Sequence, residues 1–130
     1  MNRRQLLALM SVAGAAALIC SAAWANFTAY SAQSFKTTLQ SGAPVVVHVH
    51  ADWCPTCRKQ LPTLQSMMQE KDYAATKFVR VDFDKDKDFL TAYKVTSQST
   101  ILVFKAGKEV ERLAGVTDPA QLRSRIKAAI

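Results

Sequence analysis

Apolar residues recur with two different spacings along residues 26–130, and these spacings predict alternating strands and helices. Val45 to His50 is a β-branched run that is apolar on both faces until its histidines, as in a strand buried inside a parallel sheet. Phe78 to Phe83 alternates and predicts a second strand. Thr100 to Phe104 and Glu109 to Leu113 predict two more, joined by a hairpin turn at Ala106-Gly107.

Helical spacing fills the segments between these strands. Ser31 to Gln40 predicts a short helix, and Pro55 opens a second one that should reach about Lys71. A third short helix is expected up to about Tyr93, and the last one begins at Asp118-Pro119. The resulting order of elements predicts one α/β domain, a three-layer α/β/α sandwich around a single mixed sheet.

The first 25 residues follow a different pattern. A short basic start holds Arg3 and Arg4, Leu6 to Ala23 is apolar or small apart from two serines, and Ala23-Trp24-Ala25 has the small-x-small form of a signal peptidase site. We therefore expect residues 1–25 to be a cleaved signal peptide before a domain at residues 26–130. An uncleaved membrane anchor is the alternative, since the run is just long enough to span a bilayer. The arginine pair leaves both the Sec and the twin-arginine export routes open.

The net charge and the number of cysteines are considered for residues 26–130, without the leader. The chain has 17 Lys and Arg against 10 Asp and Glu, and loss of Arg3 and Arg4 leaves a charge of about +5. The basic residues are scattered without an aromatic-interleaved stripe, so nucleic acid is not an expected partner. Cys20 falls in the leader, which leaves Cys54 and Cys57. A bridge between them closes too small a loop to stabilise the fold much, so redox or metal chemistry is the better explanation for the pair.

Cys54 and Cys57 lie where a buried strand meets the start of a helix. Unpaired N–H groups and the helix dipole stabilise a thiolate at the first turn of a helix, and the thiolate is the form that attacks a disulfide. We expect Cys54 to be the exposed nucleophile. Cys57, one turn later, should face inward and attack the resulting mixed disulfide. Trp53 is expected beside Cys54 as a shield and substrate platform, although packing alone would explain it equally well.

The stretch Ala51-Asp52-Trp53-Cys54-x-x-Cys57 resembles the active site of the thioredoxin superfamily. The resemblance covers residues 27–130, with matches at Pro62 in the active-site helix, at Thr100 to Gly107, and at Gly115 before the last helix. It implies a thioredoxin-like fold, a redox-active Cys54–Cys57 disulfide, Cys54 as nucleophile and Cys57 as resolving residue. With the leader, the chain is most similar to periplasmic thioredoxin-like proteins, which implies a periplasmic location.

The chain departs from this family pattern around the cysteines. Pro-Thr separates them, so Cys54 lacks the histidine neighbour of strongly oxidising periplasmic enzymes, and a less oxidising couple is expected. His48 stands where thioredoxins carry a buried Asp, and Arg80 where the family often has Lys. His48 is therefore a candidate proton acceptor for the resolving cysteine. A hydrogen-bonded core histidine without a catalytic role is the alternative interpretation.

The substrate-binding loop departs from the family as well. By resemblance, Gln98, Ser99 and Thr100 are the substrate-binding residues, with Ser99 at the position of the family's cis-proline. A cis bond before a non-proline residue costs about 3 kcal/mol, so the Gln98–Ser99 bond should be trans. In the family this loop pairs with substrate backbone and keeps metals away from the cysteines, so the change affects both expectations.

Together these observations predict an exported thiol–disulfide oxidoreductase, leaning towards reduction, that acts on protein thiols and disulfides. No organic cofactor and no metal are expected at the site, the protein should be a monomer, and a periplasmic reductant would need a membrane electron donor. The competing hypothesis is a thioredoxin-fold module that binds Cu or Zn through Cys54, Cys57, His48 and His50 without exchanging disulfides. His48 and His50 share one face of their strand, so at least one of them could reach the cysteines.

Overall fold

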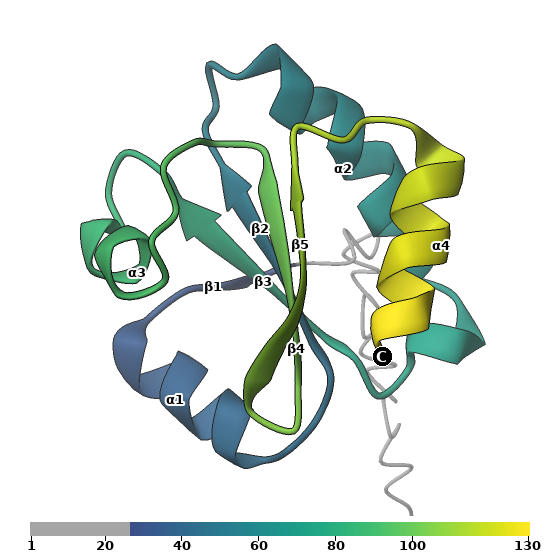
Figure 1. The fold of residues 1–130 in the computed structure, drawn as a ribbon, viewed down its shortest axis with the longest axis horizontal. Coiled ribbons are helices and arrows are strands. Elements are labelled where there is room, and N and C mark those ends of the chain that lie inside the picture. The colour runs from purple at the N-terminus through teal and green to yellow at the C-terminus, as the bar shows by residue number, and fades with distance from the viewer. Residues whose placement is uncertain (1–26) are drawn as a thin grey trace, which may run out of the picture.

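A mixed sheet of five strands forms the centre of the computed structural model, which describes residues 27–130 (Figure 1). The strand order is β1-β3-β2-β4-β5. The predicted signal peptide lies outside the described residues. Within residues 27–130 no helix is long and apolar enough to cross a bilayer. The strands are β1 (Thr28–Ala29), β2 (Val45–His50), β3 (Lys77–Asp82), β4 (Thr100–Lys105) and β5 (Lys108–Ala114).

Strand β2 occupies the middle of the sheet, and all six of its residues are buried. It pairs in parallel with β3 and antiparallel with β4, while β1 adds to β3 in parallel and β5 adds to β4 antiparallel. Because β2 is covered on both faces, its side chains are apolar on both faces up to His48 and His50, as the sequence predicted. The carboxyl end of β2 leads directly into the cysteine motif.

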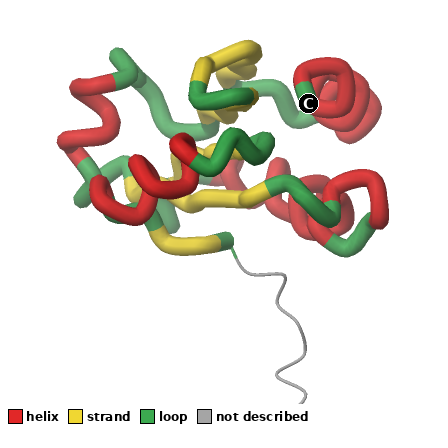
Figure 2. Tube along the Cα trace, turned by 90° about the horizontal axis from the view of Figure 1, so that it is seen from below, coloured by secondary structure: helices red, strands yellow, loops and turns green. Residues whose placement is uncertain are grey.

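Two helices cover each face of the sheet (Figure 1), and the view from below in Figure 2 shows helices on both sides of the strands. Helices α1 (Ala32–Gln40) and α3 (Lys87–Ala92) lie on one face, and α2 (Pro55–Met68) and α4 (Pro119–Ala129) on the other. Each face has its own apolar cluster. The first includes Phe35, Val47, Val81, Phe89 and Phe104, and the second includes Val46, Leu64, Met67, Ile101, Leu122 and Ile126. The predicted three-layer α/β/α sandwich with one mixed sheet is confirmed.

Side-chain caps explain where three of the helices begin. Ser31 Oγ accepts the backbone N–H of Ser34 at the start of α1, and an Asp118 carboxylate oxygen accepts that of Gln121 at the start of α4. Each cap satisfies one of the donors that a helix leaves free at its N-terminus. Helix α2 is capped by a sulfur, that of Cys54. The cap of α2 is therefore part of the candidate site.

The structure departs from the sequence prediction at strand β1 and at the end of α2, whereas the third helix lies where it was expected. It adds the two-residue strand β1 at Thr28–Ala29, which is too short to show an alternating pattern. Helix α2 ends at Met68, and the chain continues as a short 3-10 helix, η1 (Lys71–Tyr73), where a longer α-helix was expected. Helix α3 begins at Lys87, after a turn in which the carboxylates of Asp82 and Asp86 accept backbone N–H groups. These changes lie away from the cysteines.

We expect buried positions of the sheet to contribute more to stability than exposed ones. Val46→Ala removes two methyl groups from a fully buried position in β2 and should lower the free energy of unfolding by about 2 kcal/mol. Val110→Ala in β5 is a matched control, because it removes the same groups from an exposed strand position and should cost less than about 0.5 kcal/mol. Urea unfolding of the reduced proteins gives both values. Equal losses would contradict the assignment of the core.

Candidate active site

The two cysteines lie at the N-terminus of α2, directly after the carboxyl end of β2. Cys54 is the N-cap residue, with extended backbone, and its Sγ accepts the backbone N–H of Cys57 at 3.1 Å. Pro55 occupies the first helical turn, where a missing N–H costs nothing. Both cysteines are free thiols in the structure. The strand–turn–helix context predicted from the sequence therefore places Cys54 Sγ among the unpaired donors of a helix start.

Burial of Cys54 corrects one expectation. The sequence analysis expected an exposed Cys54 in front of an inward-facing Cys57, but both side chains are buried, with relative exposures of 1% and 0%. They form a small cluster with Ala51, against which Phe83 packs. The Ser99 hydroxyl also lies 3.0 Å from Cys54 Sγ and 3.1 Å from Cys57 Sγ. Cys54 is thus covered by the neighbouring loop, and Cys57 faces inward as predicted.

The two thiols have pKa values displaced in opposite directions. Burial alone would raise the pKa of the Cys54 thiol, but hydrogen bonds from the Cys57 thiol, the Ser99 hydroxyl and the backbone N–H groups at the helix start outweigh burial and lower it. Burial raises the pKa of the Cys57 thiol, and its hydrogen bond to Cys54 raises it further. Cys54 is therefore the more readily ionised member of the reduced pair.

Ser99 is fixed in an unusual backbone conformation. Its φ is +64°, in the left-handed region, and no peptide bond among residues 27–130 is cis, so the Gln98–Ser99 bond is trans as expected. The backbone N–H of Ser99 donates to Val49 O at 2.9 Å, and its carbonyl accepts the N–H of Gly115 at 3.0 Å. These bonds compensate for a conformation that costs roughly 1–2 kcal/mol in a residue with a Cβ. They hold the hydroxyl between the two sulfurs.

The neighbours of Ser99 are less closely involved with the thiols. Thr100 begins β4, and its hydroxyl donates to the carbonyl of Ser97 at 2.9 Å. Gln98 is half-buried. Of the three residues predicted to bind substrate in this loop, the structure brings Ser99 directly to the sulfurs.

His48 lies fully buried in the middle of β2. Its Nε2 is 2.9 Å from Gln60 Oε1, and the ring of Phe27 lies 5.8 Å from the imidazole between centroids. Burial lowers the pKa of His48 to about 4, against a smaller opposing effect of the Gln60 hydrogen bond. The imidazole is therefore neutral and a weak base. Its role as proton acceptor for Cys57 stays a prediction.

Gln60 connects these parts of the site, and the sequence analysis missed it. Its Nε2 donates to the carbonyls of Ser99 at 3.0 Å and Val116 at 2.8 Å, while its Oε1 faces His48. The side chain is fully buried, one turn after Cys57. Its position could have been noticed, because it shares the inward-facing helical spacing of Cys57 and Leu64 yet is polar.

His50 lies at the end of β2 and belongs to the same polar group. Its Nε2 is 3.1 Å from an Asp52 carboxylate oxygen, which also accepts a hydrogen bond from Arg80 at 2.9 Å. Burial, followed by the nearby positive charge of Arg80, lowers the pKa of His50. Hydrogen bonding to His50, followed by the charge of Arg80, lowers the pKa of the exposed Asp52 carboxyl. These shifts favour the charged carboxylate of Asp52 and the uncharged ring of His50.

Trp53 is the large apolar side chain at the surface of the site. It is 54% exposed, its Nε1 donates to an Asp84 carboxylate oxygen at 2.8 Å, and its ring meets that of Phe83 edge to face. Hydrogen bond and ring contact together hold the exposed indole in one orientation next to Cys54. Its role as a shield and substrate platform stays a prediction.

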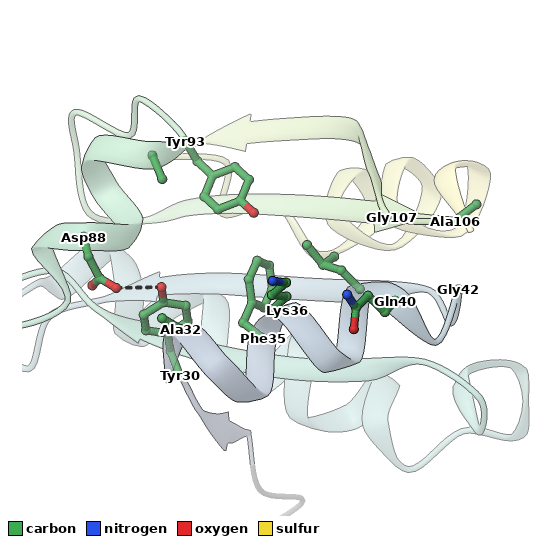
Figure 3. Close-up of a pocket in the computed structure, with 12 residues that line it drawn as sticks. Tyr30, Ala32, Phe35, Lys36, Gln40, Gly42, Asp88, Tyr93, Ala106 and Gly107 are labelled. Carbon is green, nitrogen blue, oxygen red and sulfur yellow. Dashed lines mark hydrogen bonds between the residues drawn. The ribbon is translucent and has the colours of Figure 1, made fainter.

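A pocket of the described domain lies away from the cysteines. It has a volume of about 770 Å³ and opens along α1, where Figure 3 shows Phe35 and Tyr93 facing each other and the hydroxyl of Tyr30 bonded to Asp88 at 2.9 Å. None of the predicted site residues lines it. The two thiols at the N-terminus of α2 therefore lie outside this pocket.

The pair of free cysteines at the start of α2 and the strand order β1-β3-β2-β4-β5 are features that can be compared with known families. The thioredoxin family model matches residues 26–128. The chain belongs to the thioredoxin family. Among its relatives, mouse mitochondrial thioredoxin is 34% identical over 92 residues, 71% of this chain and 55% of that protein. The thioredoxin of Chlamydia trachomatis is 33% identical over 92 residues, 71% of this chain and 87% of that protein.

Solved structures agree with this family assignment. Trxlp from Edwardsiella tarda has a TM-score of 0.72 and 35% identity, covering 75% of this chain and 96% of that one. Oxidised thioredoxin from Plasmodium falciparum has a TM-score of 0.69 and 26% identity, covering 81% of this chain and all of that one. The chain spans about half the length of the mammalian mitochondrial thioredoxins that it matches.

Ser99→Ala should slow alkylation of this thioredoxin-family site. The substitution removes the hydroxyl that bonds Cys54 Sγ, and loss of a hydrogen bond worth about 1 kcal/mol should lower the iodoacetamide rate at mildly acidic pH roughly fivefold. Mass spectrometry locates the label. Ser97→Ala is the matched control, because that hydroxyl faces Thr100 and should leave the rate unchanged. A wild-type rate for Ser99→Ala would show that the hydroxyl does not stabilise the thiolate.

Proposed function

We propose that the protein is a thiol–disulfide oxidoreductase acting on protein substrates. The observation that carries this proposal is the position of Cys54 Sγ, which caps α2 and accepts the Cys57 N–H at 3.1 Å, with the Cys57 thiol adjacent. Membership of the thioredoxin family supports it. A purely structural disulfide would not need a helix terminus beneath its first sulfur.

In the reducing direction the Cys54 thiolate attacks one sulfur of a substrate disulfide. The substrate S–S bond breaks, a Cys54–substrate disulfide forms, and the released substrate sulfur takes up a proton. Cys57 then loses its proton, and its thiolate attacks Cys54 Sγ and releases the second substrate thiol. The protein ends as the Cys54–Cys57 disulfide, having given two electrons to the substrate. Oxidation of a substrate dithiol is the same sequence in reverse.

The opposite pKa displacements suit this order of events. Cys54 is the better thiolate in the reduced protein, whereas Cys57 stays protonated until the mixed disulfide has formed. Once Cys54 is bonded to substrate, the hydrogen bond that raises the Cys57 pKa is gone, because the Cys54 sulfur no longer carries charge. Resolution is thereby delayed until a substrate is attached.

The exposed indole of Trp53 and the side chain of Gln98 are the proposed substrate contacts. The N–H and carbonyl of Ser99 already have partners in Val49, Gly115 and Gln60. Because the Ser99 backbone is occupied, substrate pairing along this loop should differ from that of family members with proline at this position.

Export, location and direction belong to the same proposal. The leader at residues 1–25 supports secretion to the periplasm, and the absence of a cationic residue between the cysteines supports a reductase over a strong oxidase. A periplasmic reductase needs a membrane donor to return it to the dithiol state. We propose that it acts as a monomer.

Cysteine substitutions test the exchange mechanism. Cys54→Ser should abolish reduction of insulin disulfides, because no thiolate remains at the helix start, whereas Cys57→Ser should accumulate mixed disulfides that it cannot resolve. Non-reducing gels and mass spectrometry of trapped adducts measure both effects. Equal trapping by the two variants would contradict the assigned roles. If both variants kept full insulin-reducing activity, the exchange mechanism itself would be refuted.

The reduction potential of the Cys54–Cys57 couple tests the direction. We expect a value closer to the −270 mV or so of thioredoxin than to the −120 mV or so of the strongest periplasmic oxidase. Equilibration with glutathione or dithiothreitol buffers, followed by quantification of free thiols, gives the potential. A value near that of the oxidase would contradict the reductase assignment while leaving exchange intact.

A further inference from the structure

Two buried histidines present nitrogen atoms that have no partner among residues 27–130. These atoms are Nδ1 of His48 and Nδ1 of His50. Both side chains are more than nine-tenths buried, and the two rings lie 5.4 Å apart between centroids. An unsatisfied buried acceptor costs about 1–3 kcal/mol, so two such atoms in one place need an explanation.

The hydrogen-bond network fixes which ring nitrogen carries the proton. Gln60 uses its Nε2 to donate to two carbonyls, so its Oε1 is the atom that faces His48 and must accept from the His48 Nε2–H. The Asp52 carboxylate oxygen, which also accepts from Arg80, likewise accepts from the His50 Nε2–H. In both neutral rings Nδ1 is therefore left with a free lone pair. Each ring has the tautomer of a ligand that coordinates through Nδ1.

The partners of the two rings match those of metal-binding histidines. A ligating histidine usually donates its other N–H to a carboxylate or a carbonyl, which fixes the ring orientation. Asp52 supplies a carboxylate for His50, and Gln60 supplies a carbonyl for His48. One ring nitrogen of each histidine and the Sγ of Cys57 all lie within 4.8 Å of one another.

We propose that His48, His50 and Cys57 of the reduced protein form a Cu(I) site. Thiolate and imidazole are ligands that suit Cu(I). The Cys57 thiol releases its proton to the solvent as a Cu–S bond forms, with no change in the oxidation state of copper or sulfur. This inference goes beyond the proposed exchange function and does not depend on it.

Charge favours Cu(I) over Zn(II) at this position. One thiolate and two neutral imidazoles make Cu(I) a neutral complex, whereas Zn(II) would leave a net positive charge buried near Arg80. A buried uncompensated charge is costly. Structural zinc also prefers four protein ligands, and the assembled group offers three.

Metal and disulfide would exclude each other at Cys57. The copper-bound form needs the Cys57 thiolate, so a Cys54–Cys57 disulfide removes a ligand and releases the ion. Cys54 is not one of the three grouped ligands and stays at the helix start. The site therefore binds copper only in the reduced state.

Cu(I) titration of the full chain tests the site. The protein carries Cys20→Ser, so that the thiol of the leader does not contribute, and competes anaerobically for Cu(I) with a chromophoric chelator. We expect one Cu(I) per reduced chain and none per oxidised chain. X-ray absorption of the loaded protein should show one sulfur and two nitrogen neighbours. Two sulfur neighbours without nitrogen, or no binding, would overturn the proposal.

Variants in the same Cys20→Ser background separate the ligands. His48→Gln and His50→Gln should each weaken Cu(I) binding at least about tenfold, and Cys57→Ser should weaken it far more. Cys54→Ser is the matched control, because it removes the neighbouring sulfur and should retain the site. An equal loss of Cu(I) affinity in the two cysteine variants would overturn the proposal. So would unchanged Cu(I) affinity in the His48→Gln, His50→Gln double variant. Circular dichroism shows whether each variant is folded. If a histidine variant unfolds, the X-ray absorption spectrum of the copper-loaded Cys20→Ser protein still decides the proposal.

Parallel assays keep this proposal distinct from the exchange function. Protein that reduces insulin but fails to bind Cu(I) overturns the copper site alone. Protein that binds Cu(I) through the three named residues but exchanges no disulfide overturns the exchange proposal alone.

Discussion

The hydrogen bonds of Ser99 are the constraint on which the site depends. Its backbone N–H is tied to Val49 at the end of β2, its carbonyl is tied to Gly115 after β5 and to Gln60 in α2, and its hydroxyl lies between the two sulfurs. Ser99 thus joins the central strand, the active-site helix and the last sheet hairpin at one point. Without these bonds a residue with a Cβ would not hold a φ of +64°, and the hydroxyl would leave the thiols.

The sequence could predict those parts of the fold that rest on a strong local pattern. Strand β2, the hairpin at Ala106-Gly107, and helices α2 and α4 were predicted correctly. A β-branched run buried on both faces, residues that allow a positive φ, and a proline at a helix start each leave a signature in residue type. Strand β1 was missed because two residues carry no period, and it exists only because β3 has a free edge to pair with. The early end of α2 at Met68 has no comparable marker in the sequence.

The candidate site was predictable in its residues but less so in its environment. Cys54, Cys57, His48 and Ser99 were all singled out, and the structure brings them together. The burial of Cys54 was not foreseen, because it is caused by a loop more than forty residues away in sequence whose hydroxyl reaches the sulfur. Gln60 was not foreseen either, since one polar residue on a helix gives no sign that its partners will be two carbonyls and a histidine.

One polar network serves two chemistries that need opposite things from Cys57. Exchange requires Cys57 to stay protonated until a mixed disulfide forms, and burial secures this by raising its pKa. Copper binding requires the same thiol to ionise. The positive charge of the bound cation can stabilise the thiolate, which burial alone disfavours. The buried histidines favour the second outcome without preventing the first, because one ring nitrogen of each lies within 4.8 Å of the Cys57 sulfur. Which chemistry occurs at Cys57 is therefore set by what reaches it, a substrate disulfide through Cys54 or a soft cation.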